Sequence, residues 1–442
     1  MRIASCCLCL AAAATSGAIA EAQFTTIIDA PPMAVIPNAV LGSDTQLNVR
    51  SGGTVSNFVQ AGASDGSSTN VEVNVLGGFV GGGFTANLGS KVNISGGTIG
   101  NGFTTYGGDV SMSGGSMGDG VFVANSVFNV TGGTVGNNFA AHSNSVVNLS
   151  GGSVGHTFTT YFGSTVNVLG GAVGNDFDAL QGSSVCICGG AVGNDFDANS
   201  GSHVSISSGS VGNRFEAFNG SKVNITGGIV GDNLIVRGGS SVAISGGSVG
   251  KNSSASGPVT ISGGTIGDSF FADVGSFVNL YGGSVGADFD AGFGGKVNLF
   301  GTQFTVAAAD ITSTLALNVP LTISQRGVAL SGILADGSPF SFDLNSIDAA
   351  NQDYFSPNAT VTVTLVLPGD FDRDGDDDGA DFLAWQRGNS PGRQSTGDLS
   401  MWKTNFGAVA AISITMLVPE PAATTMTIAL VFALLRCRRH SL

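Results

Sequence analysis

The sequence predicts an all-β protein built around a parallel β-helix, and three observations support this prediction. A unit of about 19 residues repeats through the middle of the chain, and apolar residues return at fixed positions within it. These residues alternate with polar ones, which is the pattern of strands with one buried face. Glycine accounts for 70 of the 442 residues, and each interior glycine destabilises a helix by about 1 kcal/mol. A short fixed period is typical of a solenoid, in which each coil packs on the next.

A glycine doublet marks each repeat. The doublets, or close variants of them, start at residues 52, 77, 96, 114, 132, 151, 170, 189, 227, 246, 263 and 282, and Ser208-Gly209 fills the missing step. They predict thirteen coils, and Phe300-Gly301 marks a degenerate fourteenth repeat. We expect the doublet, and the glycine four residues after its start, to supply bends with positive φ, a conformation that glycine adopts freely.

Two apolar columns are expected to fill the interior. Three residues after the start of each doublet, the column reads Val55, Val80, Ile99, Met117, Val135, Val154, Val173, Val192, Val211, Val230, Val249, Ile266 and Val285. Seven residues after it, phenylalanine stands at 84, 103, 139, 158, 177, 196, 215, 270 and 289, with Val59, Val121, Leu234 and Ser253 in the other coils. Val-x-Ile pairs before the doublet, such as Val92 and Ile94, complete the predicted core.

A column of asparagines is expected on the outer surface. It comprises residues 74, 93, 129, 148, 167, 224, 279 and 298. Stacked asparagine amides can hydrogen-bond along a column of parallel strands, so we expect a ladder from coil to coil. This polar face is also one on which a carbohydrate could bind.

A set of carboxylates flanks the phenylalanine column. Its members are Asp176, Asp178, Asp195, Asp197 and Glu216. They are expected to form a solvated acidic face, with a weak cation site as the alternative. Arg214 follows Asp195 by 19 residues, which predicts a surface ion pair.

No catalytic constellation is evident. His142, His156 and His203 occupy different positions in their coils, so they predict neither a catalytic triad nor a metal site. Cys186 and Cys188 could form a bridge, bind a soft metal or do neither, and we expect that they do neither. We therefore expect no catalytic residue and no organic cofactor.

The net charge disfavours nucleic acid as a partner and favours divalent cations. The chain carries a formal charge of −15 and no basic stripe that could bind phosphates, so nucleic acid is not an expected partner. The doublets are not the glycine-rich calcium nonapeptide, because an extra residue separates the doublet from the third glycine.

An acidic stretch after the repeats predicts a calcium loop. It reads "GDFDRDGDDDGADFLAWQ" and begins at Gly369. With Asp370 as position 1, its oxygen ligands follow the spacing of a twelve-residue calcium loop. The predicted ligands are Asp370, Asp372, Asp374, Asp376 through its carbonyl, Asp378 and Asp381. The alternative is a disordered acidic linker, which the helix-like "DFLAWQR" disfavours.

This stretch resembles a type I dockerin, a family that pairs two loop–helix units. The resemblance covers residues 368–407, but the second unit keeps only Asp398 and the helix-like "DLSMWKTNFG", and Asp377 stands where the family places an aliphatic residue. The resemblance implies one Ca²⁺ instead of two, and a cohesin-like partner.

The two ends of the chain predict export and surface sorting. Residues 1–22 are typical of a secretory signal peptide, with an A-x-A cleavage site at Ala18–Ala20. The tail holds Val418-Pro419-Glu420-Pro421, an apolar run of residues 422–435 and a basic end. It resembles the PEP-CTERM sorting signal, which implies processing by an exosortase-type enzyme. The run is short for a stable transmembrane helix, so transient membrane contact is expected.

The sequence therefore predicts the following organisation. A signal peptide (1–22) precedes a lead-in or cap (23–45), the parallel β-helix (46–301), a β-rich cap (302–367), the dockerin-like calcium module (368–407), and a linker with the sorting signal and its hydrophobic helix (408–442). The predicted function is that of an exported, non-enzymatic structural or adhesive protein of the cell surface or extracellular matrix, with extracellular polysaccharide as a further candidate partner. The alternative is a polysaccharide lyase or glycoside hydrolase built on a β-helix.

Overall fold

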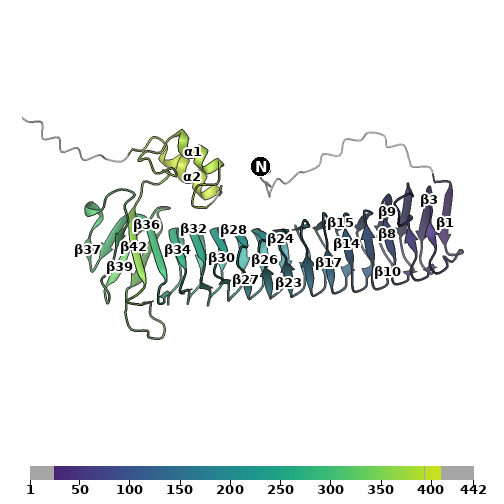
Figure 1. Ribbon diagram of the computed structural model, residues 1–442, viewed down its shortest axis with the longest axis horizontal. Coiled ribbons are helices and arrows are strands. Elements are labelled where there is room, and N and C mark those ends of the chain that lie inside the picture. The colour runs from purple at the N-terminus through teal and green to yellow at the C-terminus, as the bar shows by residue number, and fades with distance from the viewer. Residues whose placement is uncertain (1–23, 393, 410–442) are drawn as a thin grey trace, which may run out of the picture. The chain divides into compact units, whose positions relative to one another are not determined.

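The predicted parallel β-solenoid is confirmed. The structure, a computed structural model, describes residues 24–392 and 394–409. The coils number about 14 and follow one another in chain order (Figure 1). The predicted signal peptide and the predicted sorting signal lie outside the described residues.

Each coil contributes up to three strand segments. The segments before the glycine doublet are β1 (Thr26–Ala30), β3 (Thr45–Val49), β6 (Val71–Val75), β9 (Ser90–Ile94), β12 (Asp109–Met112), β15 (Val127–Val130), β18 (Val146–Leu149) and β21 (Thr165–Val168). Those after it are β4 (Thr54–Val55), β7 (Phe79–Val80), β10 (Thr98–Ile99), β13 (Ser116–Met117), β16 (Thr134–Val135), β19 (Ser153–Val154) and β22 (Ala172–Val173).

In the later coils these two segments form one strand that runs through the doublet. These strands are β24 (Ser184–Val192), β26 (His203–Val211), β28 (Lys222–Val230), β30 (Ser241–Val249), β32 (Pro258–Ile266), β34 (Phe277–Val285) and β36 (Lys296–Val306). All of them belong to one sheet of 27 strands.

The third segments form a second sheet of 15 strands. They are β2 (Val40–Leu41), β5 (Gln60–Ala61), β8 (Thr85–Asn87), β11 (Thr104–Tyr106), β14 (Phe122–Ala124), β17 (Phe139–Ala141), β20 (Phe158–Thr160), β23 (Phe177–Ala179), β25 (Phe196–Ala198), β27 (Phe215–Ala217), β29 (Ile235–Val236), β31 (Ser254–Ala255), β33 (Phe271–Ala272), β35 (Asp290–Ala291) and β41 (Tyr354–Phe355).

The repeat sets the register of both sheets. Phe158 pairs with Phe177, and Phe177 pairs with Phe196, so equivalent residues of successive coils lie side by side. All nine predicted phenylalanines are buried, and the other predicted column is buried except for Val285, which is partly exposed. Successive phenylalanine rings stack at centroid distances of 4.6–4.8 Å from Phe139 to Phe215.

The doublet and the third glycine of each repeat need glycine for different reasons. Gly152, the second residue of its doublet, has φ 73°, and a Cβ there would lie 2.6 Å from the carbonyl oxygen of Gly133 in the preceding coil. The third glycine, such as Gly155, has no positive φ, so our expectation for it is wrong. A Cβ on Gly155 would lie 2.4 Å from Asn137 Oδ1 of the preceding coil, so this position needs glycine for close packing. Positive φ occurs instead two residues later, as in Thr157 at 63°.

The predicted asparagine ladder is confirmed. The Nδ2 atom of Asn167 donates to Oδ1 of Asn148, and Asn148 donates to Asn129, each at 2.8 Å. Thr362 Oγ1 extends the column by donating to Asn298 Oδ1 at 2.9 Å.

Residues after the repeats close the C-terminal end of the solenoid. β42 (Thr360–Leu365) pairs in parallel with β36, and β41 pairs in parallel with β35. Between β36 and β41, the chain forms four antiparallel strands and one 3₁₀ turn. These are β37 (Ala309–Asp310), η1 (Thr312–Thr314), β38 (Leu321–Thr322), β39 (Ala329–Leu334) and β40 (Pro339–Asp343). Two helices follow, α1 (Gly379–Gln386) and α2 (Thr396–Asn405).

Candidate metal centre

The acidic loop connects β42 to α1 and is fixed by the start of that helix. Asp378 is the N-cap of α1, and its carboxylate accepts from the backbone N–H of Ala380 at 2.6 Å. Asp381 completes a capping box by accepting from the N–H of Asp378 at 2.8 Å. Reciprocal capping of this kind satisfies orphan donors at a helix start, so two of the predicted ligands also define where the helix begins.

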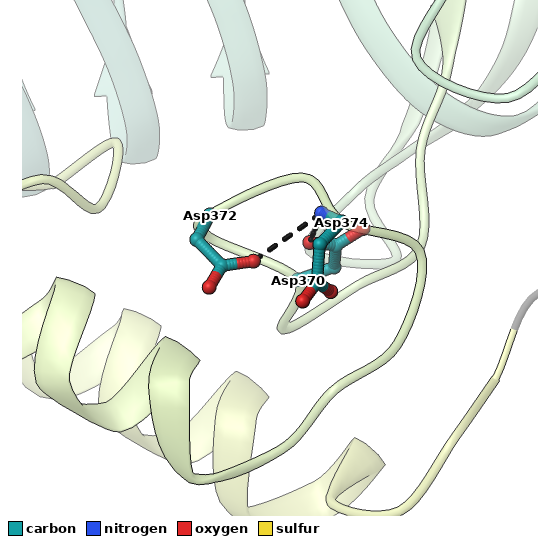
Figure 2. Close-up of side chains that lie close together, drawn as sticks. All are labelled: Asp370, Asp372 and Asp374. Carbon is teal, nitrogen blue, oxygen red and sulfur yellow. Dashed lines mark hydrogen bonds between the residues drawn. The ribbon is translucent and has the colours of Figure 1, made fainter.

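The first half of the loop gathers three carboxylates. Asp370, Asp372 and Asp374 have ligand oxygens within 4.8 Å of one another (Figure 2). The backbone N–H of Asp374 donates to Asp370 Oδ1 at 3.1 Å and to Asp372 Oδ1 at 3.2 Å. The N–H of Gly375 also donates to Asp370, at 3.1 Å. These bonds curl the backbone around Asp370 and leave other carboxylate oxygens free for a ligand.

The second half gathers three more. Carboxylate oxygens of Asp376, Asp378 and Asp381 also lie within 4.8 Å of one another. The structure therefore brings the six predicted residues into two groups of three. Asp381 is buried, and its oxygens accept from the N–H groups of Phe371, Asp372 and Asp378 at 2.6–3.0 Å.

Burial and mutual repulsion destabilise the charged forms of these carboxylates. Desolvation raises the pKa of Asp370, Asp372 and Asp376, and neighbouring carboxylates raise it further. For Asp376 the repelling neighbours are Asp374, Asp378 and Asp381. A cation in the loop would relieve this repulsion, because an opposite charge within a few ångströms favours the ionised form.

Asp377 is the feature that the twelve-residue spacing does not explain. Its side chain is fully buried, and neither carboxylate oxygen has a hydrogen-bond partner. Desolvation, followed by the charge of Asp381, raises its pKa to about 7. The carboxylate packs against Gly369, where any Cβ would collide with it. Asp377 belongs to neither carboxylate group, but Asp376 Oδ1 of the second group is likewise buried without a hydrogen-bond partner, which fits a loop that holds a cation.

The second loop–helix unit lacks this concentration of charge. Asp398 of α2 corresponds to Asp381 of α1, and it too is buried. One of its oxygens accepts from the N–H of Gly392 at 2.7 Å, and its own N–H donates to Ser395 Oγ at 2.9 Å. Protein donors therefore satisfy Asp398.

The loop also contacts the last coils of the solenoid. Arg373 Nη2 donates to Tyr281 Oη at 2.8 Å, and its guanidinium lies 5.5 Å from the ring centroid of Phe300. The Tyr281 and Phe300 rings stack at 4.0 Å. Sequence reasoning did not identify Arg373, because its partners lie 92 and 73 residues earlier and no repeat connects them.

The acidic face of the solenoid differs from the prediction in one respect. The predicted pair of Arg214 and Asp195 is confirmed at 3.1 Å. Glu216, however, is buried, where a solvated side chain was expected. It accepts from Arg214 Nε at 3.2 Å and from Arg237 Nη2 at 2.6 Å, and these two arginines compensate its burial. Asp197 has a pKa raised to about 6, chiefly by desolvation and then by the charges of Asp178 and Glu216.

The cysteines differ from the prediction, and two histidines make contacts that the sequence did not reveal. Cys186 and Cys188 form a disulfide, so the expectation that they do nothing is wrong. His156 Nδ1 accepts from the N–H of Asn175 at 3.1 Å. His142 stacks on Tyr161 at 3.8 Å and on Phe122 at 4.3 Å. These partners make the two histidines part of the packing between coils.

Comparison of the chain with protein families, with curated proteins and with solved structures returned no match. Within residues 24–392 and 394–409, no helix has the length and apolar character needed to cross a membrane.

Proposed function

We propose that the chain is an exported, non-enzymatic protein of the cell surface or extracellular matrix. In this proposal the β-solenoid is the structural body, and the loop at residues 370–381 binds one Ca²⁺. The tail delivers the protein to the surface through processing by an exosortase-type enzyme.

The observation that carries the non-enzymatic proposal is the form of the coils. Across residues 46–301, all of which the structure describes, strands and tight bends account for nearly the whole repeat. Catalytic groups are usually carried by loops that project from a rigid scaffold. The longest excursion in this region, residues 62–70, contains one carboxylate, Asp65. Such coils suit a structural element better than a substrate cleft.

The calcium proposal rests on the two carboxylate groups and on the unpartnered Oδ1 atom of Asp376. Asp370, Asp372, Asp374, Asp378 and Asp381 would hold the ion, together with an oxygen of Asp376. Hard oxygen ligands at these intervals suit Ca²⁺. When bound, the ion supplies positive charge that offsets the repulsion among the carboxylates. The residues themselves hold the loop closed through their bonds to backbone N–H groups.

Export, sorting and partners rest on sequence alone. The predicted signal peptide and the PEP-CTERM-like tail support delivery to the surface, where the polar faces of the coils would bind an extracellular polysaccharide. The dockerin resemblance supports a cohesin-like partner for residues 368–407.

The test is to incubate the purified protein with a panel of acidic and neutral polysaccharides, scoring both binding and chain cleavage. The proposal expects no cleavage of any substrate. Release of new reducing or unsaturated ends, absent from a heat-denatured control, would contradict it.

A second candidate function is favoured by Asp178 and Asp197. They lie side by side on the adjacent parallel strands β23 and β25, and burial raises the pKa of both. Carboxylates with raised pKa values act as general acids in glycoside hydrolysis. If the panel reveals cleavage, Asp197→Asn should abolish it, whereas Asp119→Asn on a distant coil should not.

A further inference from the structure

The acidic loop is anchored to the solenoid by a residue that lies between two of its carboxylates. Arg373 stands between Asp372 and Asp374, and its Nη2 atom donates to Tyr281 Oη at 2.8 Å. Its guanidinium lies 5.5 Å from the ring centroid of Phe300. Tyr281 belongs to β34 and Phe300 to β36. The position of the loop at residue 373 therefore depends on the last coils as well as on the loop itself.

The backbone at Arg373 shows that this contact has a cost. Its φ is 63°, in the left-handed region that favours glycine. A residue with a Cβ is destabilised in this conformation. The hydrogen bond and the ring contact of the Arg373 side chain offset that cost, and a glycine at this position could make neither contact.

Asn318 of the cap provides a second anchor. Its backbone N–H donates to the carbonyl of Leu365 at 2.8 Å, which fixes Asn318 to the end of β42. Its Nδ2 atom donates to the carbonyl of Arg373 at 3.4 Å and to Asp370 Oδ2 at 3.5 Å. A residue outside the loop therefore contacts a candidate calcium ligand directly.

Repulsion among the carboxylates opposes this closed arrangement. Desolvation, followed by the charges of Asp381 and Asp374, raises the pKa of Asp372. Separation of these carboxylates would shift the backbone at Arg373, which lies between two of them, and would break its bond to Tyr281. Because a cation favours the ionised carboxylates, it should also stabilise the docked position of Arg373.

We propose that Tyr281 and Asn318 are positioning residues of the calcium site, so that calcium binding and docking of the loop on the solenoid stabilise each other. Groups that hold metal ligands in place without touching the metal can change metal affinity by about 10–100-fold. Such linkage is reciprocal, since calcium must favour docking by the same factor by which docking favours calcium. The inference rests on the proposed calcium site and adds that the solenoid contributes to its affinity.

The test measures the calcium affinity of the full-length chain by titration calorimetry. Tyr281→Phe keeps the ring that stacks on Phe300 and removes the oxygen that accepts from Arg373. It should weaken calcium binding about fivefold, the effect expected for one hydrogen bond, and leave the stoichiometry at one. Asn318→Ala should weaken binding in the same direction. Tyr161→Phe is the matched control, because it removes the same oxygen from a distant coil, and it should leave the affinity unchanged.

Two further measurements separate positioning from a general loss of stability. Arg373→Gln should also weaken calcium binding, and combining it with Tyr281→Phe should add little, because the two changes remove the same bond. Trypsin cleaves after arginine, so the rate at which fragments ending at Arg373 appear reports its docking. At saturating calcium this rate should be higher in Tyr281→Phe than in the wild-type chain. Circular dichroism of each variant establishes that it is folded.

The outcomes distinguish this inference from the calcium site on which it rests. Wild-type calcium affinity in both Tyr281→Phe and Asn318→Ala overturns the inference and leaves the calcium site standing. Fully additive effects of Tyr281→Phe and Arg373→Gln overturn linkage through their bond. A wild-type chain that binds no calcium overturns both the site and the inference.

Discussion

Trp385 and Trp402 bind each other's helices in a reciprocal arrangement. Trp385 Nε1 donates to the carbonyl of Ser395, the N-cap of α2, at 2.9 Å, and Trp402 Nε1 donates to the carbonyl of Asp378, the N-cap of α1, at 2.7 Å. Each tryptophan lies seven residues after the N-cap of its own helix. The two loop–helix units are therefore structurally equivalent, although only the first carries an acidic loop.

This equivalence predicts different consequences for the two tryptophans. Trp402→Phe removes the donor to the N-cap carbonyl beside the acidic loop, so it should lower calcium affinity as well as stability. Trp385→Phe removes the equivalent bond at Ser395 and should lower stability alone. Each bond contributes about 1 kcal/mol to the free energy of unfolding. Urea unfolding and calcium titration, both followed by circular dichroism, separate the two effects. Equal loss of calcium affinity in both variants would contradict the asymmetry.

The phenylalanine column predicts a large difference between inward and outward substitutions. Phe177 is fully buried between Phe158 and Phe196, at 4.8 and 4.7 Å. Truncating such a residue destabilises a fold by about 3–5 kcal/mol, and Phe177→Asp adds an unpaired buried charge. Asn167→Asp, on the outer column, removes one donor and should lower stability by about 1 kcal/mol. Thermal melting compares them, and equal melting temperatures would mean that the column is not the core.

Asp197 predicts a pH dependence of stability. Its pKa is raised to about 6 from 3.8, so the folded chain binds this proton more tightly than the unfolded chain does. The resulting stabilisation is fully present below about pH 4 and is lost as the pH rises through about 6. Asp197→Asn should therefore raise the melting temperature relative to wild type at about pH 8 and change it little at about pH 4.

The control for this prediction is Asp119→Asn. Asp119 is exposed, and its Oδ1 accepts from the N–H of Asn137 at 2.7 Å, a bond that an amide oxygen can also make. Its effect on the melting temperature should not grow with pH. An Asp197→Asn difference that is the same at both pH values would show that the carboxylate is not destabilised in the fold.

The sequence predicted the inward columns and the asparagine ladder because their residues recur at a fixed period and with one chemistry. Even there, packing added something that periodicity does not reveal. In the coil where Val121 replaces phenylalanine, Phe128 from the neighbouring strand fills the space and contacts Phe103 and Phe139. Val121 in the phenylalanine column and Phe128 in the neighbouring column each depart from the repeat, and the two departures compensate each other in the packed core.

A second ladder was missed altogether. Five residues after most doublets start, a side-chain oxygen or nitrogen accepts the backbone N–H of the equivalent residue in the next coil; Gly82, Lys251 and Ala287 are the exceptions. Asn175 Oδ1 accepts from Asn194, Asn194 Oδ1 accepts from Asn213, and Asn213 Oδ1 accepts from Asp232, at 2.8–2.9 Å. Asn, Asp and His all appear in this column, so the shared property is an acceptor at the right distance and not a residue type.

The grouping of the carboxylates in the acidic loop was predictable because local spacing alone defines it, whereas contacts across the chain were not. The docking of Arg373 on Tyr281 and the burial of Glu216 between two arginines depend on which residues meet in space. The unpartnered state of Asp377 likewise follows from its packing against Gly369.

Processing predicts a defined mature chain. Cleavage after about Ala20 and after about Pro421 removes Arg2, Arg436, Arg438 and Arg439. Four of the 16 basic residues are lost while all 31 acidic ones stay, so the net charge changes from −15 to −19. The intact mass of protein isolated from its native host tests this. A C-terminus at Leu442 would exclude removal of the sorting signal.

Calcium binding is the most direct test of the candidate metal centre. The mature chain should bind one Ca²⁺. Both carboxylate groups lie in the loop before α1, and the described part of the loop before α2 contains no such group. Asp370→Ala should abolish binding, since Asp370 belongs to the first group and also accepts the N–H bonds that close the loop. Asp398→Ala should weaken packing but leave the ion bound, because its carboxylate accepts protein donors in the second unit.

Two signals report this binding. Trp385 and Trp402 are the only tryptophans in the chain, and Phe382 lies 5.5 and 4.9 Å from their rings, so ordering of the loop should change their fluorescence. Calorimetry gives the stoichiometry, and chelation should reverse both signals and lower the melting temperature of the module. Two equivalent sites, or no binding at millimolar Ca²⁺, where even weak extracellular calcium sites are occupied, would exclude the site formed by Asp370 to Asp381.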